Sequence, residues 1–325
     1  MSKKVNNKIL VYILIGFAII YALVKVYQHK FTDNTLNVSL VKIDTLKVTK
    51  ILLYPVSEGR NEIKFFKDGK DWKINKGKIT TDPEANSVQS LLEVLLESKT
   101  QRLASREKNK WADYNVTDTT ATRVKVYEGD KLTLDMLVGK FSYQPRNDQY
   151  SKMYGGGGTG TTYIRLTGED NVYAIDGFLS FSLNRQFNTF RNQALTRIDK
   201  PSVNKITFRY PGDSSFLVSL TNKKWMIGNQ MADSNKVAEY LNLLANKNAS
   251  VFDDNFVPSL NPQCQVTIEG KDIKTVTIDA YIRSQNDFIL NSNQNSKSWF
   301  SSGYKGLYSE VFKNKKDFFA GKKKK

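Results

Sequence analysis

The stretch KILLYP at residues 50–55 recurs as KITFRYP at residues 205–211. Each stretch is rich in apolar residues and ends at a proline, which predicts a β-strand closed by a turn. An alternating segment follows each stretch, and then a tryptophan-containing strand, WKI at residues 72–74 and WMI at residues 225–227. The same signals in the same order predict two copies of one structural unit.

An amphipathic helix is predicted after the tryptophan strand of each copy. The first helix is expected to begin at Asp82-Pro83, with an N-cap residue followed by proline at the first helical position, and the second near Asp233-Ser234. Apolar residues recur at helical spacing in both. These residues are Val88, Leu91, Leu92, Leu95 and Leu96 in the first helix, and Val237, Tyr240, Leu241 and Leu244 in the second.

Paired strands are predicted beyond each helix, joined by turns at EGD, residues 128–130, and EGK, residues 269–271. A further strand follows in each copy, and a terminal helix is expected around residues 181–192 and 304–312. This order predicts an α+β fold with two tandem, similar lobes of mainly antiparallel sheet and packed helices. The lobes are expected to span residues 45–199 and 200–320, with the boundary near Asp199-Lys200-Pro201.

Residues 9–24, ILVYILIGFAIIYALV, form a run of sixteen residues without a charge. Past Lys25, Val26 and Tyr27 extend the run to about 20 residues, the length of a transmembrane helix. A cleaved signal peptide is the alternative, but the run is longer than a usual signal core and no small-x-small cleavage site follows. Residues 1–30 are therefore predicted to be a cytoplasmic tip and an uncleaved anchor, and residues 31–44 a linker.

The distribution of charge favours membrane-flank chemistry over nucleic-acid binding. The formal net charge is +17, but residues 1–30 hold five lysines and no acidic residue, and Lys322–Lys325 supply four more. Each lobe is only mildly basic and mixes both signs, whereas a nucleic-acid footprint concentrates basic residues on one stripe. Lys3, Lys4 and Lys8 favour a cytoplasmic N-terminus, which places the bulk of the chain outside the cytoplasm.

The sequence predicts no catalytic residue, no cofactor and no metal site. His29 is the only histidine and flanks the predicted anchor, and Cys264 is the only cysteine. A histidine-activated nucleophile in a folded pocket, a His/Cys metal site and an intramolecular disulfide are therefore excluded. Carboxylate pairs such as Asp253-Asp254 and Glu169-Asp170 leave a carboxylate-only hydrolase as a minor alternative, although adjacent acids in loops are usually solvated.

Two low-complexity segments have competing interpretations. YGGGGTGTTY at residues 154–163 contains a GxGxxG string at Gly155, Gly157 and Gly160. A strand follows it rather than a helix, which excludes a dinucleotide fingerprint, so a mobile hairpin loop is predicted, with ligand or partner contact as the alternative. The tail Lys322–Lys325 is predicted to be solvated, with contact to anionic lipid headgroups as the alternative.

The order of these motifs resembles a bacterial family, the domain of unknown function 4340, over residues about 40–320. Family members often have Tyr-Gly-Leu where this chain has Tyr114-Asn115-Val116, and asparagine suits a left-handed residue nearly as well as glycine. The segments that carry the resemblance are the Trp72 strand, the leucine-rich helix after Asp82, ADYNV at residues 112–116, YIR at residues 163–165 and VYAI at residues 172–175.

The resemblance implies an envelope-anchored protein, of a kind often encoded beside the permease and auxiliary subunits of ABC-type transport systems, including gliding-associated ones. It implies no catalytic residues. We therefore expect a non-catalytic accessory or scaffold subunit, held in the bacterial inner membrane by residues 9–27 as a single-pass protein and bound to such subunits. The alternative is an extracytoplasmic binding module for a glycan or another ligand, with exposed aromatic side chains as its platform.

Overall fold

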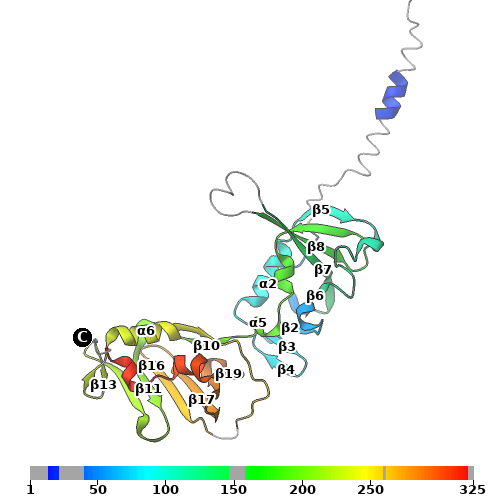
Figure 1. Cartoon of the computed structure of the whole chain (residues 1–325). Helices are drawn as coiled ribbons and strands as arrows, with labels where there is room; N and C mark the ends of the chain where they lie inside the picture. The colour runs from blue at the N-terminus through cyan, green and yellow to red at the C-terminus, as the bar shows by residue number, and fades with distance from the viewer. Residues whose placement is uncertain (1–13, 22–39, 146–157, 259–260, 321–325) are drawn as a thin grey trace, which may run out of the picture. The chain divides into compact units, whose positions relative to one another are not determined.

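The computed structural model describes residues 14–21, 40–145, 158–258 and 261–320 (Figure 1). It contains two large, mainly antiparallel sheets with packed helices, which confirms the predicted α+β class. Contacts divide the chain into two compact units, the first made of Met1–Phe66 and Gln89–Arg185 and the second of Lys67–Val88 and Gln186–Lys325. This division and the predicted lobes differ because residues 82–84 hydrogen-bond with residues 190–192, both in the second unit.

The first large sheet has the strand order β4-β3-β2-β1-β6-β7-β8-β9-β5. The strands are β1 (Val48–Tyr54), β2 (Ile63–Asp68), β3 (Asp71–Lys76), β4 (Ile79–Thr81), β5 (Thr100–Ser105), β6 (Thr122–Glu128), β7 (Lys131–Pro145), β8 (Gly158–Leu166) and β9 (Val172–Asp176). The helices in this part of the chain are η1 (Val56–Glu58), α2 (Ser87–Leu96), η2 (Lys108–Lys110), α4 (Leu179–Leu183) and α5 (Phe187–Phe190).

The second large sheet has the order β14-β13-β12-β11-β16-β17-β18-β19, and a small sheet pairs β10 with β15. The strands are β10 (Ala194–Arg197), β11 (Val203–Arg209), β12 (Phe216–Thr221), β13 (Lys224–Ile227), β14 (Gln230–Met231), β15 (Asn246–Asn248), β16 (Cys264–Gly270), β17 (Val276–Ser284), β18 (Asp287–Ser292) and β19 (Phe300–Gly303). The helices are η3 (Lys200–Ser202), η4 (Gly212–Ser214), α6 (Ser234–Ala245), η5 (Asn293–Asn295), η6 (Tyr304–Tyr308), α7 (Ser309–Val311) and η7 (Lys315–Phe318).

The recurring sequence stretches occupy matching strands, β1 and β11. Each pairs with the strand that follows it and with the first strand beyond the helix, so that Ile51 lies opposite Phe65 and Val126. Ile206 likewise lies opposite Val218 and Ile268. Each strand also has a register shift near its start, between Val48 and Lys50 and between Val203 and Lys205. Trp72 and Trp225 lie in β3 and β13, which hold the same place in the two orders.

Both predicted helical stripes are buried except for Leu96, which is half-buried. The second helix begins as expected, because the Asp233 carboxylate accepts hydrogen bonds from the backbone N–H groups of Asn235 and Lys236. The core of the second unit lies between this stripe and the sheet, where Phe208 stacks on Phe216 at 4.5 Å between ring centroids. The buried stripe residues are Val88, Leu91, Leu92 and Leu95 in α2, and Val237, Tyr240, Leu241 and Leu244 in α6.

The predicted start of the first helix at Asp82-Pro83 is wrong, because α2 begins at Ser87. The Asp82 carboxylate binds the Lys73 ammonium, and the Asp82 carbonyl accepts a hydrogen bond from the Asn192 N–H at 2.9 Å. Pro83 forms an antiparallel bridge with Arg191. Asp82-Pro83 is therefore extended chain paired with a distant segment, and proline there resembles a helix start only in the local sequence.

The predicted terminal helices are shorter than expected. Residues 181–192 contain part of α4 and the single turn α5, with the backbone extended at Gln186 between them. Residues 304–312 form a π-helical turn followed by the three-residue α7, and Gly306 departs from helical geometry within the π-helical turn. Because Gly306 has φ −104° and ψ −141°, the helical hydrogen-bond pattern cannot run through it unchanged.

The segment Tyr114-Asn115-Val116 packs closely against β7. Asn115 has φ 55°, the left-handed conformation that the family resemblance implied for this position. The Tyr114 carbonyl accepts a hydrogen bond from the Lys140 N–H at 3.0 Å. Buried Arg165 donates to the Val116 carbonyl at 3.0 Å and stacks on Trp111 at 3.6 Å, which holds the loop from its other side.

Replacing Asn115 with glycine is therefore expected to leave the stability of the full chain unchanged or slightly higher. Asn115→Val should lower it by about 1–2 kcal/mol, because a β-branched residue tolerates the left-handed conformation poorly. The comparison is read from the thermal unfolding midpoints of the two variants in detergent. A valine variant as stable as the glycine variant would contradict the conformational reason.

The predicted anchor lies largely outside the described residues. Residues 14–21 are helical, and residues 9–13 and 22–27 are not among those described. Searched over the described ranges alone, the chain has no helix both long enough and apolar enough to cross a membrane. His29 and the tail Lys322–Lys325 also lie outside the described residues.

Candidate functional site

Three of the four carboxylates noted in the sequence pairs are engaged in structural contacts. Asp254 binds Arg191 through two hydrogen bonds of 2.8 Å, and Asp253 binds Arg283 at 2.7 Å. In the other pair, Glu169 accepts a hydrogen bond from the Tyr173 hydroxyl at 2.8 Å. These contacts occupy oxygens that an acid–base mechanism would need, and among the described residues no cluster of His, Cys, Asp and Glu could hold a metal ion.

Arg191 is the most buried cation of the second unit that the structure describes, with 1% of its side chain exposed. Its guanidinium lies 3.7 Å from the centre of the Phe252 ring and binds Asp254 on the same short segment. Arg191 immediately follows α5. It therefore joins the segment after α5 to residues 252–254, and sequence reasoning missed it because an arginine carries no local signal of burial.

The single cysteine is also structural. Cys264 is buried in β16, and burial raises the pKa of its thiol. The Tyr308 hydroxyl lies 3.6 Å from the sulfur. A buried thiol of raised pKa is a poor nucleophile near neutral pH.

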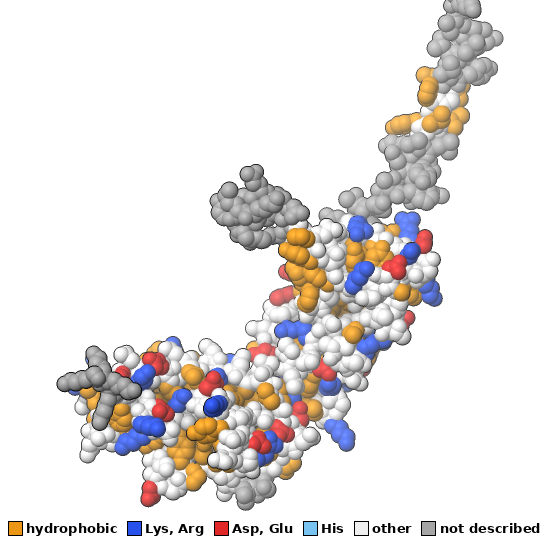
Figure 2. All heavy atoms as spheres, in the orientation of Figure 1, with side chains coloured by type: hydrophobic (Ala, Val, Ile, Leu, Met, Phe, Trp, Pro, Cys, Tyr) orange, Lys and Arg blue, Asp and Glu red, His pale blue; other side chains and the backbone are white. Residues whose placement is uncertain are grey.

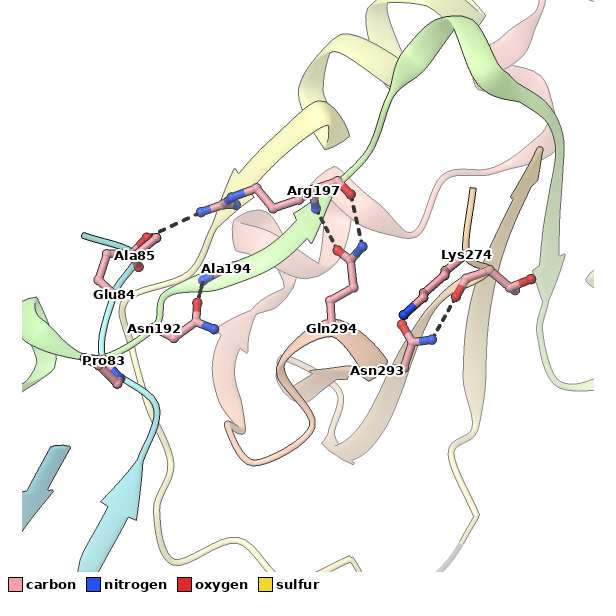
Figure 3. Close-up of a pocket in the computed structure, with 10 residues that line it drawn as sticks. Pro83, Glu84, Ala85, Asn192, Ala194, Arg197, Lys274, Asn293 and Gln294 are labelled. Atoms are coloured by element: carbon pink, nitrogen blue, oxygen red, sulfur yellow. Dashed lines mark hydrogen bonds and ion pairs between the residues drawn. The ribbon is translucent and has the colours of Figure 1, made fainter. Parts of the chain in front are cut away.

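A polar pocket of 540 Å³ lies within the second unit (Figure 3). Figure 3 shows Glu84 and Lys274 on opposite sides of this pocket, with Arg197 between them. The lining mixes amides and charged groups with apolar surface and holds no aromatic ring, and its amides and charged groups can bind a polar ligand. Its lining residues are Pro83, Glu84, Ala85, Asn192, Ala194, Arg197, Lys274, Thr275, Asn293 and Gln294.

Most polar groups of the pocket already serve the fold. Gln294 accepts from the Arg197 N–H at 2.7 Å and donates to the Arg197 carbonyl at 3.0 Å, as a neighbouring strand would. The Asn293 side chain accepts a hydrogen bond from the Thr277 N–H in β17 and donates one to the carbonyl of Thr275, the residue before β17. The carboxylate of Glu84 lies 3.8 Å from the Arg197 guanidinium. A ligand would therefore compete with, or add to, contacts that hold the strands together.

Four aromatic side chains gather on the first unit, half-buried Phe141 and exposed Tyr143, Phe178 and Phe181, here called the aromatic surface. Tyr143, Phe178 and Phe181 are 50%, 53% and 60% exposed. The Phe141 ring lies 5.0 Å from that of Phe178 and 4.9 Å from that of Phe181. Figure 2 shows hydrophobic side chains gathered on this unit. A contiguous exposed apolar patch of this kind marks interaction sites.

Glycines of the predicted hairpin loop form the floor of the aromatic surface. Gly158 and Gly160 lie in β8 rather than in a loop, while residues 154–157 are not described. A Cβ atom on Gly158 would lie 2.3 Å from the Tyr143 ring, and one on Gly160 would lie 2.8 Å from the Phe141 ring. The glycines therefore leave room for the rings of β7. Gly158 and Gly160 are two residues apart, as are Phe141 and Tyr143. This matched spacing was the signal in the sequence.

The geometry defines an α+β protein whose most distinctive exposed feature is an apolar surface. In comparison with known families, the model of the domain of unknown function DUF4340 matches residues 72–261. This chain belongs to that family, which confirms the resemblance read from the sequence. No match was found among curated proteins or among solved structures.

Proposed function

We propose that this chain is a membrane-anchored, non-catalytic accessory or scaffold subunit of a bacterial envelope complex of the ABC-type transport or gliding-associated kind. The aromatic surface is the observation that carries the proposal. Three of its four rings are half exposed or more, and aromatic residues are enriched in protein–protein interfaces, where they supply most of the binding energy. A partner subunit that covers the rings would remove their apolar area from water.

The proposed anchor is residues 9–27, which would hold the protein in the inner membrane as a single-pass protein with the bulk of the chain outside the cytoplasm. The uncharged run at residues 9–24 and the lysines before it support this placement. The helical conformation of residues 14–21 agrees with it. Such an anchor would keep the folded part beside membrane-embedded partners and raise their effective concentration.

We also infer that the folded part arose by duplication of one unit, with lobes at residues 45–199 and 200–320. The matching strand orders, the register shifts at the starts of β1 and β11, and the tryptophan strands β3 and β13 support this inference. The aromatic surface belongs to the first copy. By strand register, Ile282 of β17 holds the position that Phe141 holds in β7, so the aromatic surface is not repeated there and the proposed partner contact belongs to the first lobe.

Affinity isolation of the tagged chain from its native membranes in mild detergent tests the proposed function. We expect permease or ATPase subunits to co-purify at a fixed ratio, and the variant Phe178→Ser/Phe181→Ser to lose most of them. The matched control Leu220→Ser/Met231→Ser removes exposed apolar residues from the second unit and should retain them. A wild-type chain that isolates alone would contradict the proposal.

A binding module for a saccharide or another polar ligand is the second candidate, because the second unit contains the amide- and arginine-lined pocket. This function predicts a chain that isolates alone and unfolds at a higher temperature when the saccharide is added. Saturation at about 100 times the dissociation constant adds about 2.7 kcal/mol to the stability of the folded state. The lack of an aromatic platform in the pocket lining favours the accessory subunit over the glycan-binding module.

A further inference from the structure

The long strand β7 extends past the end of its neighbour β6. The two strands pair from Lys131 to Val138, whereas β7 and β8 stay paired as far as Pro145. Within the described residues, no strand pairs with Phe141–Pro145 on the side of β6. An exposed strand edge of this kind is a template to which another strand can be added.

Tyr143 directs its backbone polar groups toward that edge. Gly160 lies opposite Tyr143 in the ladder, and its carbonyl accepts a hydrogen bond from the Gly177 N–H at 2.9 Å on the far side of β8. The backbone N–H and C=O of Gly160 therefore point away from β7. In an antiparallel ladder, residues directly opposite each other either exchange hydrogen bonds or both point outward. The N–H and C=O of Tyr143 consequently point outward, to the edge past β6.

The aromatic surface lies on one face of the sheet next to this edge, with the Tyr143 and Phe141 rings over Gly158 and Gly160 of β8. Phe141 and Tyr143 are two residues apart in a strand, so their rings share one face of the sheet, and Phe178 and Phe181 extend that face. A groove of 310 Å³ continues inward from the edge and is bounded by Val138, Phe141 and Phe181 among others. An extended segment paired with β7 would place every second side chain over these rings.

We propose that the edge of β7 from Phe141 to Pro145 binds an extended segment of a partner protein by strand addition. Backbone hydrogen bonds would set the position of the segment, and apolar side chains at alternate positions would rest on the aromatic surface. The inference rests on the proposed function, because the segment belongs to a partner subunit. Exposed rings alone would also suit a lipid surface. The outward N–H of Tyr143 favours a peptide strand, because a strand supplies a backbone carbonyl that accepts its hydrogen bond.

Two substitutions at Tyr143 separate strand addition from simple aromatic contact. Tyr143→Val removes the ring and keeps the outward N–H, whereas Tyr143→Pro removes both and suits an edge strand. Measured by isolation of the full chain from native membranes, the partner yield of Tyr143→Pro should be about tenfold below that of Tyr143→Val, as expected for one lost interface hydrogen bond. Equal yields from the two variants would overturn the proposal.

Photocrosslinking provides a measurement that leaves the ladder intact. A benzophenone side chain is placed by Phe181→p-benzoylphenylalanine or Tyr143→p-benzoylphenylalanine in the full chain, and native membranes are irradiated. We expect adducts of both probes on one segment of one partner protein, an even number of residues apart. Adducts on phospholipid, on a second copy of this chain or on scattered protein sites would overturn strand addition.

The two proposals fail in distinguishable ways. If the wild-type chain isolates alone, the proposed function is wrong and this inference falls with it. If the partner is present with wild type and is retained equally by Tyr143→Val and Tyr143→Pro, the accessory function stands and only strand addition at β7 is wrong. Thermal unfolding of both variants should stay close to wild type, because the Tyr143 N–H takes no part in the β7–β8 ladder.

Discussion

Replacing Arg191 with leucine is expected to destabilise the second unit by about 3 kcal/mol, a large fraction of the stability of a domain. The side chain is 1% exposed, and the substitution removes both 2.8 Å hydrogen bonds to Asp254. Asp254 itself is exposed to solvent, so the expected cost comes from the lost hydrogen bonds and packing of the buried Arg191 side chain and not from a stranded charge. The contact between the guanidinium and the Phe252 ring would also be lost.

Arg283 provides a matched control for this prediction. Arg283 binds Asp253, the neighbour of Asp254 in sequence, at a comparable distance of 2.7 Å, but 38% of its side chain is exposed. Arg283→Leu is expected to cost less than about 1 kcal/mol, because solvent screens a surface ion pair. The thermal unfolding midpoint of the full chain in detergent should fall by about 6–12 °C in Arg191→Leu and by less than about 4 °C in Arg283→Leu. Equal shifts would show that burial is not the cause.

Gly139→Ala is expected to destabilise the first unit by about 3 kcal/mol. A Cβ atom at this position would lie 2.2 Å from the Tyr114 carbonyl oxygen and 2.7 Å from a methyl group of Val116. Because the nearest atom belongs to the backbone, the loop must move as a whole, and the hydrogen bond from the Lys140 N–H to Tyr114 is lost. Faster hydrogen exchange of the Lys140 amide, together with a lower unfolding temperature, checks the prediction.

Gly303 is the control for the effect of adding a methyl group to glycine. Its φ is −74°, and the nearest atom to an added Cβ is the Asn286 carbonyl oxygen at an ordinary 3.7 Å. Gly303→Ala is therefore expected to change stability by less than about 1 kcal/mol. If Gly139→Ala is tolerated as well as Gly303→Ala, the loop at Tyr114 is held less tightly than the close approach implies.

The amino-acid sequence by itself determined the succession of strands along the chain and the buried helical stripes. The apolar stretches at β1 and β11, and the 3.6-residue spacing of Val237, Tyr240 and Leu244, are local patterns that the hydrophobic effect converts into buried faces. The cap at Asp233 was also predictable, because the carboxylate binds backbone N–H groups only two and three residues away. The left-handed backbone of Asn115 was expected from the family resemblance and not from a pattern in this chain alone.

Only the tertiary structure decided which polar and aromatic residues meet. Asp82-Pro83 has the local signature of a helix start, yet its hydrogen-bond partner is Asn192, more than a hundred residues away. Arg191 and Asp254 form their pair across 63 residues, and the aromatic surface joins a strand to a helix that follows two strands later. Contacts between distant segments depend on how sheets and helices pack, and packing energies are set by neighbours that no local pattern in the chain specifies.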